Sequence, residues 1–187
     1  MITVSGAALS IATEETTNSL TAIVDRLAAK DHTLWGAEAE AEAAVRLNWI
    51  DLPNSSRALL PELDALTAWA RSRENSSIVL AGMGGSSLAP EVIAKTYKKS
   101  LTVLDTTDPD QINAAIPADL AHTLVVVGSK SGSTIETASH KAFFTKLFVD
   151  AGLNPADHFV IVTDPGSPLD KSARADGLRV ILSLIHI

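Results

Sequence analysis

The chain has 187 residues, of which 46% are hydrophobic and 20% are charged, so it can form the packed core of a domain and is not a disordered chain. Fifteen basic and 22 acidic residues leave a net charge of -7, which argues against binding nucleic acid or an anionic membrane surface. The absence of cysteine excludes disulfides, thiol catalysis and cysteine-ligated zinc, and the lack of an export signal or a long apolar run predicts a cytoplasmic protein.

Residues 1–75 are expected to form a helical segment ahead of the main domain. Apolar residues recur there at helical spacing in three stretches: Leu20, Ile23, Val24 and Leu27; Ala43, Leu47 and Ile50; Leu63, Leu66 and Trp69. A proline at position 61 suits the first turn of the third helix, where its missing N–H group would have no partner in any case. We interpret this segment as a scaffold.

Residues 76–187 alternate between short apolar runs and helix-compatible segments. The apolar runs are Ile78–Ala81, Leu101–Leu104, Leu124–Val127, Phe159–Val162 and Leu178–Leu182. Continuous runs of this kind are typical of strands buried on both faces. Helices are expected at Leu88–Lys98, Thr134–Asp150 and Pro168–Ala175. The alternation predicts an α/β, flavodoxin-like domain with a five-stranded parallel sheet and helices on both faces.

Two loops rich in glycine and serine follow the first and third predicted strands. They are Gly82–Ser87 (GMGGSS) and Gly128–Thr134 (GSKSGST). In the flavodoxin-like strand order 2-1-3-4-5 the ligand site lies between the carboxyl ends of these two strands. Glycine lets the backbone approach a ligand, while hydroxyl groups and helix N-termini donate hydrogen bonds to an anion. Serine and threonine also cap helices, so one such loop alone is ambiguous, but two at one sheet edge favour a phosphate site.

A dinucleotide site is the alternative that the first loop leaves open. Gly82–Ser87 begins like the G-x-G-x-x-G fingerprint, and Asp105 stands where a ribose-binding carboxylate would be expected. However, Ser87 occupies the third glycine position, and a dinucleotide site gives no reason for the second loop. Neither loop ends in the Gly-Lys-Ser/Thr sequence of a Walker motif.

The two loops and their flanks resemble the SIS-fold sugar isomerases. The resemblance rests on VLAGMGGSSLAPEV at 79–92 and GSKSGSTIET at 128–137, with VLDTTDP between them and VIVTDPGSPL after them. It implies an SIS domain that binds a phosphosugar, here glucose 6-phosphate and fructose 6-phosphate of glycolysis and gluconeogenesis, with no cofactor and no metal. It implies contacts to the phosphate from these residues: Gly85, Ser86, Ser129, Lys130, Ser131, Gly132, Ser133 and Thr134.

The resemblance also implies that the chain is the N-terminal part of a longer enzyme, which in this family is generally a homodimer. Family members continue into a second lobe that carries the ring-opening histidine and the proton-transferring glutamate. After Leu182 the sequence departs from the family and reads Ser183–Ile187. We therefore expect a helical segment at 1–75 and an SIS domain at 76–187, truncated at its C-terminal end. This part is expected to bind the sugar phosphate without isomerising it, so no catalytic residue is assigned.

Several other polar residues are expected to have structural roles. Glu136 and His140 lie four residues apart on one helix and could form an acid–base pair, but such a pair is ordinarily a surface contact. Asp108 and Asp164, each before a proline, fit turns or helix caps. A second hypothesis is a non-catalytic SIS module that senses a phosphosugar. Such a module would usually carry a DNA-binding or partner domain, which the acidic helical segment does not resemble.

Overall fold

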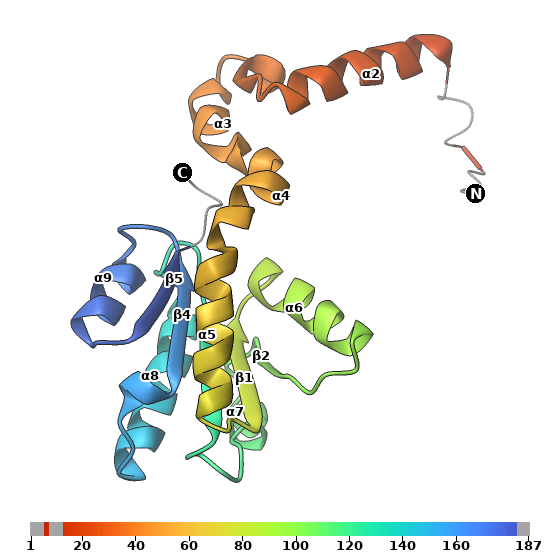
Figure 1. The fold of residues 1–187 in the computed structure, drawn as a ribbon. Coiled ribbons are helices and arrows are strands. Elements are labelled where there is room, and N and C mark those ends of the chain that lie inside the picture. Colours follow the sequence, from red (N-terminus) through yellow and green to blue (C-terminus); the bar gives the residue numbers. More distant parts are fainter. Residues whose placement is uncertain (1–5, 8–12, 183–187) are drawn as a thin grey trace. The chain divides into compact units, whose positions relative to one another are not determined.

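The computed structural model describes residues 6–7 and 13–182 (Figure 1). The expected departure from the family after Leu182 therefore lies outside the described residues. The chain divides into two compact units between Ser55 and Ser56, and each is described by itself.

The N-terminal unit is a series of short helices. They are α2 (Glu14–Ala28), η1 (His32–Trp35), α3 (Glu40–Arg46), η2 (Leu47–Asp51) and α4 (Leu52–Ser55). The Thr13 side chain caps α2 by accepting a hydrogen bond from the N–H group of Thr16. Although α2 has the helical apolar spacing, none of its residues is buried. The buried residues of this unit are Ala43 and Leu47, so it has little core of its own within the described part of the chain.

The second unit is built on a five-stranded parallel sheet in the order β2-β1-β3-β4-β5, which confirms the expected flavodoxin-like fold (Figure 1). The strands are β1 (Ser77–Gly82), β2 (Thr102–Leu104), β3 (Thr123–Gly128), β4 (Phe159–Thr163) and β5 (Arg179–Leu182). The expected apolar runs coincide with these strands. The central strand β3 pairs with β1 along its whole length, and the register places Gly82 opposite Gly128. The carboxyl ends of β1 and β3 therefore meet at one edge of the sheet.

Helices cover both faces of this sheet. They are α5 (Leu60–Ser72), α6 (Gly85–Thr96), α7 (Pro109–Ala114), α8 (Ile135–Asp150) and α9 (Pro168–Ala175), with 3-10 turns η3 (Ser56–Leu59) and η4 (Pro155–Asp157). The larger core cluster joins one face of the sheet to α7, α8 and α9, and a smaller cluster joins the other face to α5. The main core is built around Phe144, Phe148 and Phe159, each of which is fully buried.

Both aspartates that precede prolines have the local roles expected of them. Asp108 caps α7, because its Oδ1 atom accepts hydrogen bonds from the N–H groups of Asp110 and Gln111, both at 3.0 Å. The backbone carbonyl of Asp164 accepts a hydrogen bond from the N–H group of Ser167 at 3.2 Å and so forms the turn that leads into α9.

Candidate functional site

The two glycine-rich loops come together at the edge where β1 and β3 end. A methyl group on Gly82 would lie 3.1 Å from the Cβ atom of Ser86 and 3.3 Å from the carbonyl oxygen of Gly128. A methyl group on Gly128 would lie 3.5 Å from the same Ser86 Cβ atom. Ser86 therefore packs against the ends of both strands, and the absence of side chains at Gly82 and Gly128 makes this close approach possible.

The loop after β3 is held in shape by its own hydroxyl groups. Ser129 is 5% exposed, and its Oγ atom accepts a hydrogen bond from the N–H group of Gly132 at 3.1 Å. The same Oγ atom lies 3.3 Å from the Oγ1 atom of Thr134. The exposed residues Ser131 and Ser133 pair with each other, with 2.9 Å between their hydroxyl oxygens. Ser129 thus faces inward and braces the loop, while Ser131 and Ser133 present hydroxyl groups to solvent.

Two helices begin at this edge without a side-chain cap. The N-cap residues are Thr134 for α8 and Gly84 for α6, and neither helix has a side-chain hydrogen bond at its cap. Among the described residues, no acceptor pairs with the N–H groups of Ile135, Glu136 and Thr137. Free N–H groups and the helix dipole make such an N-terminus attractive to an anion.

Lys130 adds a positive charge to this edge. Its side chain is exposed, and no carboxylate of the described residues lies within ion-pair distance of it. The eight residues predicted to bind phosphate thus lie on two adjoining loops, and seven of them are exposed or half-buried, whereas Ser129 is buried.

The segment after β4 supports the loop after β3 from behind. Gly132 has a φ angle of +67°, and a Cβ atom there would lie 2.6 Å from the Cβ atom of Leu169 and 2.7 Å from its backbone nitrogen. The carbonyl of Lys130 accepts a hydrogen bond from the Thr163 hydroxyl at 3.4 Å, and that hydroxyl lies 2.8 Å from the Ser167 Oγ atom. The position of the loop therefore depends on the start of α9.

The turn before α9 is held by Asp170. Its carboxylate accepts hydrogen bonds from the N–H group of Gly166 at 2.8 Å and from the Nε atom of Arg174 at 2.6 Å. The backbone N–H group of Asp170 in turn donates to the Ser167 Oγ atom at 3.0 Å. The hydrogen bond from the Gly166 N–H group makes the largest contribution to lowering the pKa of Asp170 from its ordinary value of 3.8. The hydrogen bond from Arg174 makes the next largest contribution.

Asp170→Asn is expected to lower the free energy of unfolding at pH 7, because the ionised carboxylate is the form that these donors stabilise. Since the pKa of Asp170 is lowered in the folded state, its contribution is present above pH 3.8 and is lost as the pH falls through the lowered value. Urea unfolding between pH 7 and pH 2 should show the difference from wild type shrinking in the acid. Asp150→Asn, in the exposed pair with Lys146, is the control. A difference that stays constant down to pH 2 would contradict this role.

The Glu136–His140 pair is not the surface contact expected from the sequence. His140 is 1% exposed, and its Nε2 atom lies 2.7 Å from the carbonyl oxygen of Thr106. Because a carbonyl only accepts, Nε2 carries the proton of that hydrogen bond and Nδ1 is left buried without a partner. The expectation was wrong because α8 buries this face against the loop that follows β2. The geometry gives no support to an acid–base pair.

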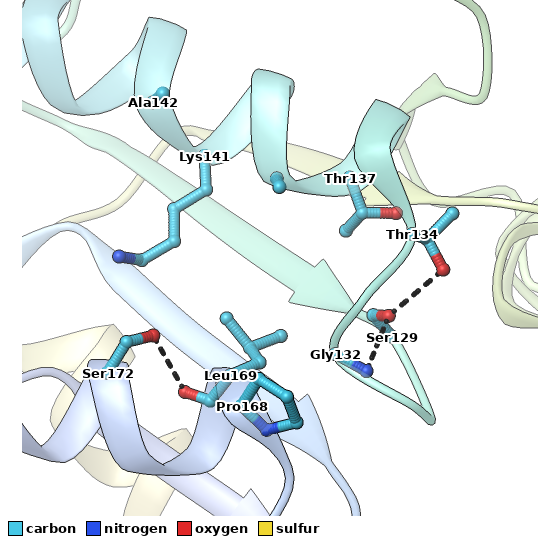
Figure 2. Close-up of a pocket in the computed structure, with 10 residues that line it drawn as sticks. Ser129, Gly132, Thr134, Thr137, Lys141, Ala142, Pro168, Leu169 and Ser172 are labelled. Atoms are coloured by element: carbon cyan, nitrogen blue, oxygen red, sulfur yellow. Dashed lines mark hydrogen bonds between the residues drawn. The ribbon is translucent and has the colours of Figure 1, made fainter.

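A cavity of about 360 Å³ lies between α8 and α9, behind the loop after β3 (Figure 2). Its lining comprises Ser129, Gly132, Thr134, Thr137, Ala138, Lys141, Ala142, Pro168, Leu169 and Ser172. Thr137 and Lys141 could not be singled out from the sequence, because inside a long helix nothing in the residue pattern separates a cavity wall from an ordinary packed face.

The sequence comparisons agree on one kind of enzyme. No protein-family model matches the chain. The glucose-6-phosphate isomerase of Chlamydia pneumoniae is 40% identical over 106 residues, which are 53% of this chain and 20% of the relative. The corresponding enzyme of Chlamydia muridarum is 38% identical over 102 residues, 51% of this chain and 20% of the relative. Both relatives are named glucose-6-phosphate isomerase. The resemblance inferred from the two loops is thereby confirmed, over a match that spans one fifth of each relative.

Solved structures support the same assignment. A glucose-6-phosphate isomerase from Chlamydia trachomatis superposes with a TM-score of 0.63 at 29% identity, over 84% of this chain and 30% of that one. A hypothetical protein from Thermus thermophilus superposes with a TM-score of 0.72 at 30% identity, over 90% of this chain and 39% of that one. Tagatose-6-phosphate ketose/aldose isomerase from Escherichia coli, at 20% identity and a TM-score of 0.52, shares the fold. The SIS-type fold is therefore confirmed.

Within residues 6–7 and 13–182, no three histidine or carboxylate side chains gather as a metal ion would require. In the same part of the chain, no helix is both long and apolar enough to cross a bilayer.

Proposed function

We propose that this chain is the sugar-phosphate-binding part of a glucose-6-phosphate isomerase and takes glucose 6-phosphate or fructose 6-phosphate. The observation that carries the proposal is the convergence of two glycine- and serine-rich loops, each opening an uncapped helix, at the carboxyl ends of β1 and β3. The named relatives support the substrate, because their name states that they isomerise glucose 6-phosphate.

The phosphate group is proposed to lie between the two loops. A phosphate dianion offers only acceptors, and this edge offers mainly donors. The N–H groups at the start of α8 and the hydroxyl groups of Ser86, Ser131, Ser133 and Thr134 would surround its oxygens, with the Lys130 ammonium group balancing the charge. Gly85 and Gly132 allow the backbone to approach. Ser129 is proposed to act indirectly: its hydroxyl oxygen accepts the hydrogen bond from the Gly132 N–H group and so fixes the shape of the loop.

The chemistry expected of this part is binding without proton transfer. An aldose–ketose isomerisation needs a group that opens the ring and a base that moves a proton between two carbons. The Glu136–His140 pair does not fit these tasks, because the His140 ring is buried and bonded to the Thr106 carbonyl. We therefore propose that these residues hold the phosphate end of the substrate while other parts of the enzyme do the chemistry.

Ser86→Ala and Ser131→Ala are each expected to weaken the binding of glucose 6-phosphate by roughly five- to 150-fold, the equivalent of about 1–3 kcal/mol for a hydrogen bond to a charged group. Isothermal titration calorimetry measures the effect. Ser100→Ala is the matched control, because Ser100 precedes β2 and lies at the opposite end of the strands. Unchanged affinity in both loop variants would contradict the proposed site.

We propose that the protein is cytoplasmic, since a chain without cysteine suits a reducing compartment.

We propose that the complete enzyme is a homodimer, as the family resemblance implies. The sugar phosphate is the proposed partner, and neither nucleic acid nor a membrane surface is, since the net charge of -7 opposes both.

A further inference from the structure

Helix α6 exposes its large apolar side chains instead of burying them against the sheet. Leu88, Val92 and Ile93 of this helix and Tyr97 at its C-cap are 57–73% exposed, whereas Ser87 is fully buried. No residue of α6 belongs to either hydrophobic cluster found among the described residues. A helix at the surface of a domain ordinarily turns its apolar side to the core, and a contiguous apolar surface marks an interaction site. The side of α6 that carries these four residues is called its outer face below.

The outer face of α6 is shaped for close approach by another helix. Successive residues of an α-helix are turned by about 100°, so Ala89 and Thr96 lie along the middle of this face and two of the large apolar side chains lie on each side of them. The Thr96 hydroxyl donates a hydrogen bond to the Val92 carbonyl at 2.7 Å, so its donor is already used within α6. Small side chains in the middle and large ones at the sides form a shallow apolar groove along the helix.

One side of this face carries charges of both signs in a fixed order. Glu91 pairs with Lys95, with 2.6 Å between Oε1 and Nζ. Lys98 and Lys99 follow the helix, and no carboxylate of the described residues lies within ion-pair distance of either. The acidic group is therefore nearer the start of α6 and the basic groups are nearer its end. A second α6 helix that runs antiparallel to the first would place Glu91 of each copy beside Lys95 of the other, so the charges complement themselves.

We propose that the outer face of α6 binds a second copy of this chain, with the two α6 helices antiparallel about a two-fold axis between Val92 and Ile93. In this register Val92 and Ile93 each meet the same residue of the second copy, and Leu88 lies at the level of Tyr97 of the second copy. A two-fold contact of this kind is closed, so association stops at the dimer. The proposal does not depend on the proposed isomerase function.

The size of this contact indicates a moderate affinity. The 12 residues of α6 form a helix about 18 Å long. One pair of such helices buries less than the roughly 1,200–2,000 Å² of a tight interface, so we expect a dissociation constant in the micromolar range. Sedimentation equilibrium of the wild-type chain from micromolar to millimolar concentration should show the average mass rising from that of one chain to that of two.

Two variants at the proposed axis, Val92→Glu and Val92→Lys, test the surface and its symmetry together. Because position 92 meets itself, each variant sets like charges against each other and should weaken the dimer more than tenfold. An equimolar mixture of the two variants should form dimers again, since unlike charges then meet. Glutamate and lysine are better helix formers than valine, so neither variant should unfold the exposed α6. Val149→Glu is the matched control, because Val149 is 58% exposed on α8, and its dimer should be as stable as that of the wild type.

Three results would overturn the proposal. A wild-type chain that stays monomeric at millimolar concentration would show that the outer face of α6 has a different occupant. A dimer that survives both Val92→Glu and Tyr97→Glu would be held by another surface. A mixture of the Val92→Glu and Val92→Lys chains that stays monomeric, although circular dichroism shows both to be folded, would exclude a two-fold axis at this residue.

Discussion

Gly132→Val is expected to weaken the binding of glucose 6-phosphate by roughly five- to 150-fold, since displacing the loop and straining its backbone costs on the order of 1–3 kcal/mol. The φ angle of +67° at this position strongly disfavours a β-branched residue. A Cβ atom would also lie 2.6 Å from the Cβ atom of Leu169, so the loop must move away from α9. That movement breaks the hydrogen bond between the Gly132 N–H group and Ser129. Calorimetric titration measures the loss.

Gly152→Val separates backbone strain from displacement of the loop. Gly152 follows the C-terminal end of α8 and has a similar φ angle of +72°, but no heavy atom lies within 4 Å of the Cβ atom that would be added there. This variant should be less stable than wild type and yet bind the sugar phosphate with wild-type affinity. Equal affinities for Gly132→Val and wild type would show that the loop after β3 does not hold the phosphate.

Phe148→Ala is expected to lower the free energy of unfolding by about 3–5 kcal/mol, the usual cost of removing a buried phenylalanine ring. The ring is fully buried, meets Phe159 edge-on at 5.6 Å between centroids, and stacks on His158 at 4.6 Å. Because Phe148 joins α8 to β4, its loss leaves a cavity in the centre of the domain. Urea unfolding monitored by circular dichroism measures the change.

Val149→Ala serves as the neighbouring control for the loss of the ring. Val149 lies on the same turn of α8 and is 58% exposed, so its truncation should change the stability by less than about 0.5 kcal/mol. The Phe148→Ala chain should still bind glucose 6-phosphate under conditions in which it is folded, because the loop lies at the other end of α8. A stability loss no larger than that of Val149→Ala would contradict the central place of Phe148 in the core.

The sheet could be predicted from the sequence because each buried strand is a short, continuous apolar run. The strand order followed from the general topology of such domains, and it placed the loops after β1 and β3 together. Helix α7 was not predicted from the sequence, because its six residues are too few to show a helical period. Its N-terminal signal was present, however, in the cap formed by Asp108 before Pro109.

Periodicity also suggested more burial than the N-terminal unit contains. The apolar residues of α2 follow the helical pattern, yet Leu20 is 57% exposed and Val24 is 61% exposed. A pattern reports which side chains share a face of the helix, and a partner element is needed to bury that face. In α5 the same kind of pattern does find a partner, since Leu66 and Trp69 pack against the sheet.

The details of the candidate site depended on contacts that sequence spacing does not reveal. The inward orientation of Ser129 arises from the turn that brings the Gly132 N–H group to its hydroxyl. Gly132, in the loop before α8, is in close contact with Leu169 of α9. The burial of His140 depends on the carbonyl of Thr106, 34 residues away. Each of these is a tertiary contact, so residue types alone could identify the two loops but not the role of each residue in them.

NMR titration of the 15N-labelled chain with glucose 6-phosphate shows whether both loops hold one phosphate group. We expect the amide signals of Gly84–Ser86 and of Lys130–Glu136 to shift together and to saturate with one common dissociation constant. Inorganic phosphate should shift the same signals more weakly. Shifts in one loop alone, or in two sets with different dissociation constants, would show that the two loops do not bind the same phosphate.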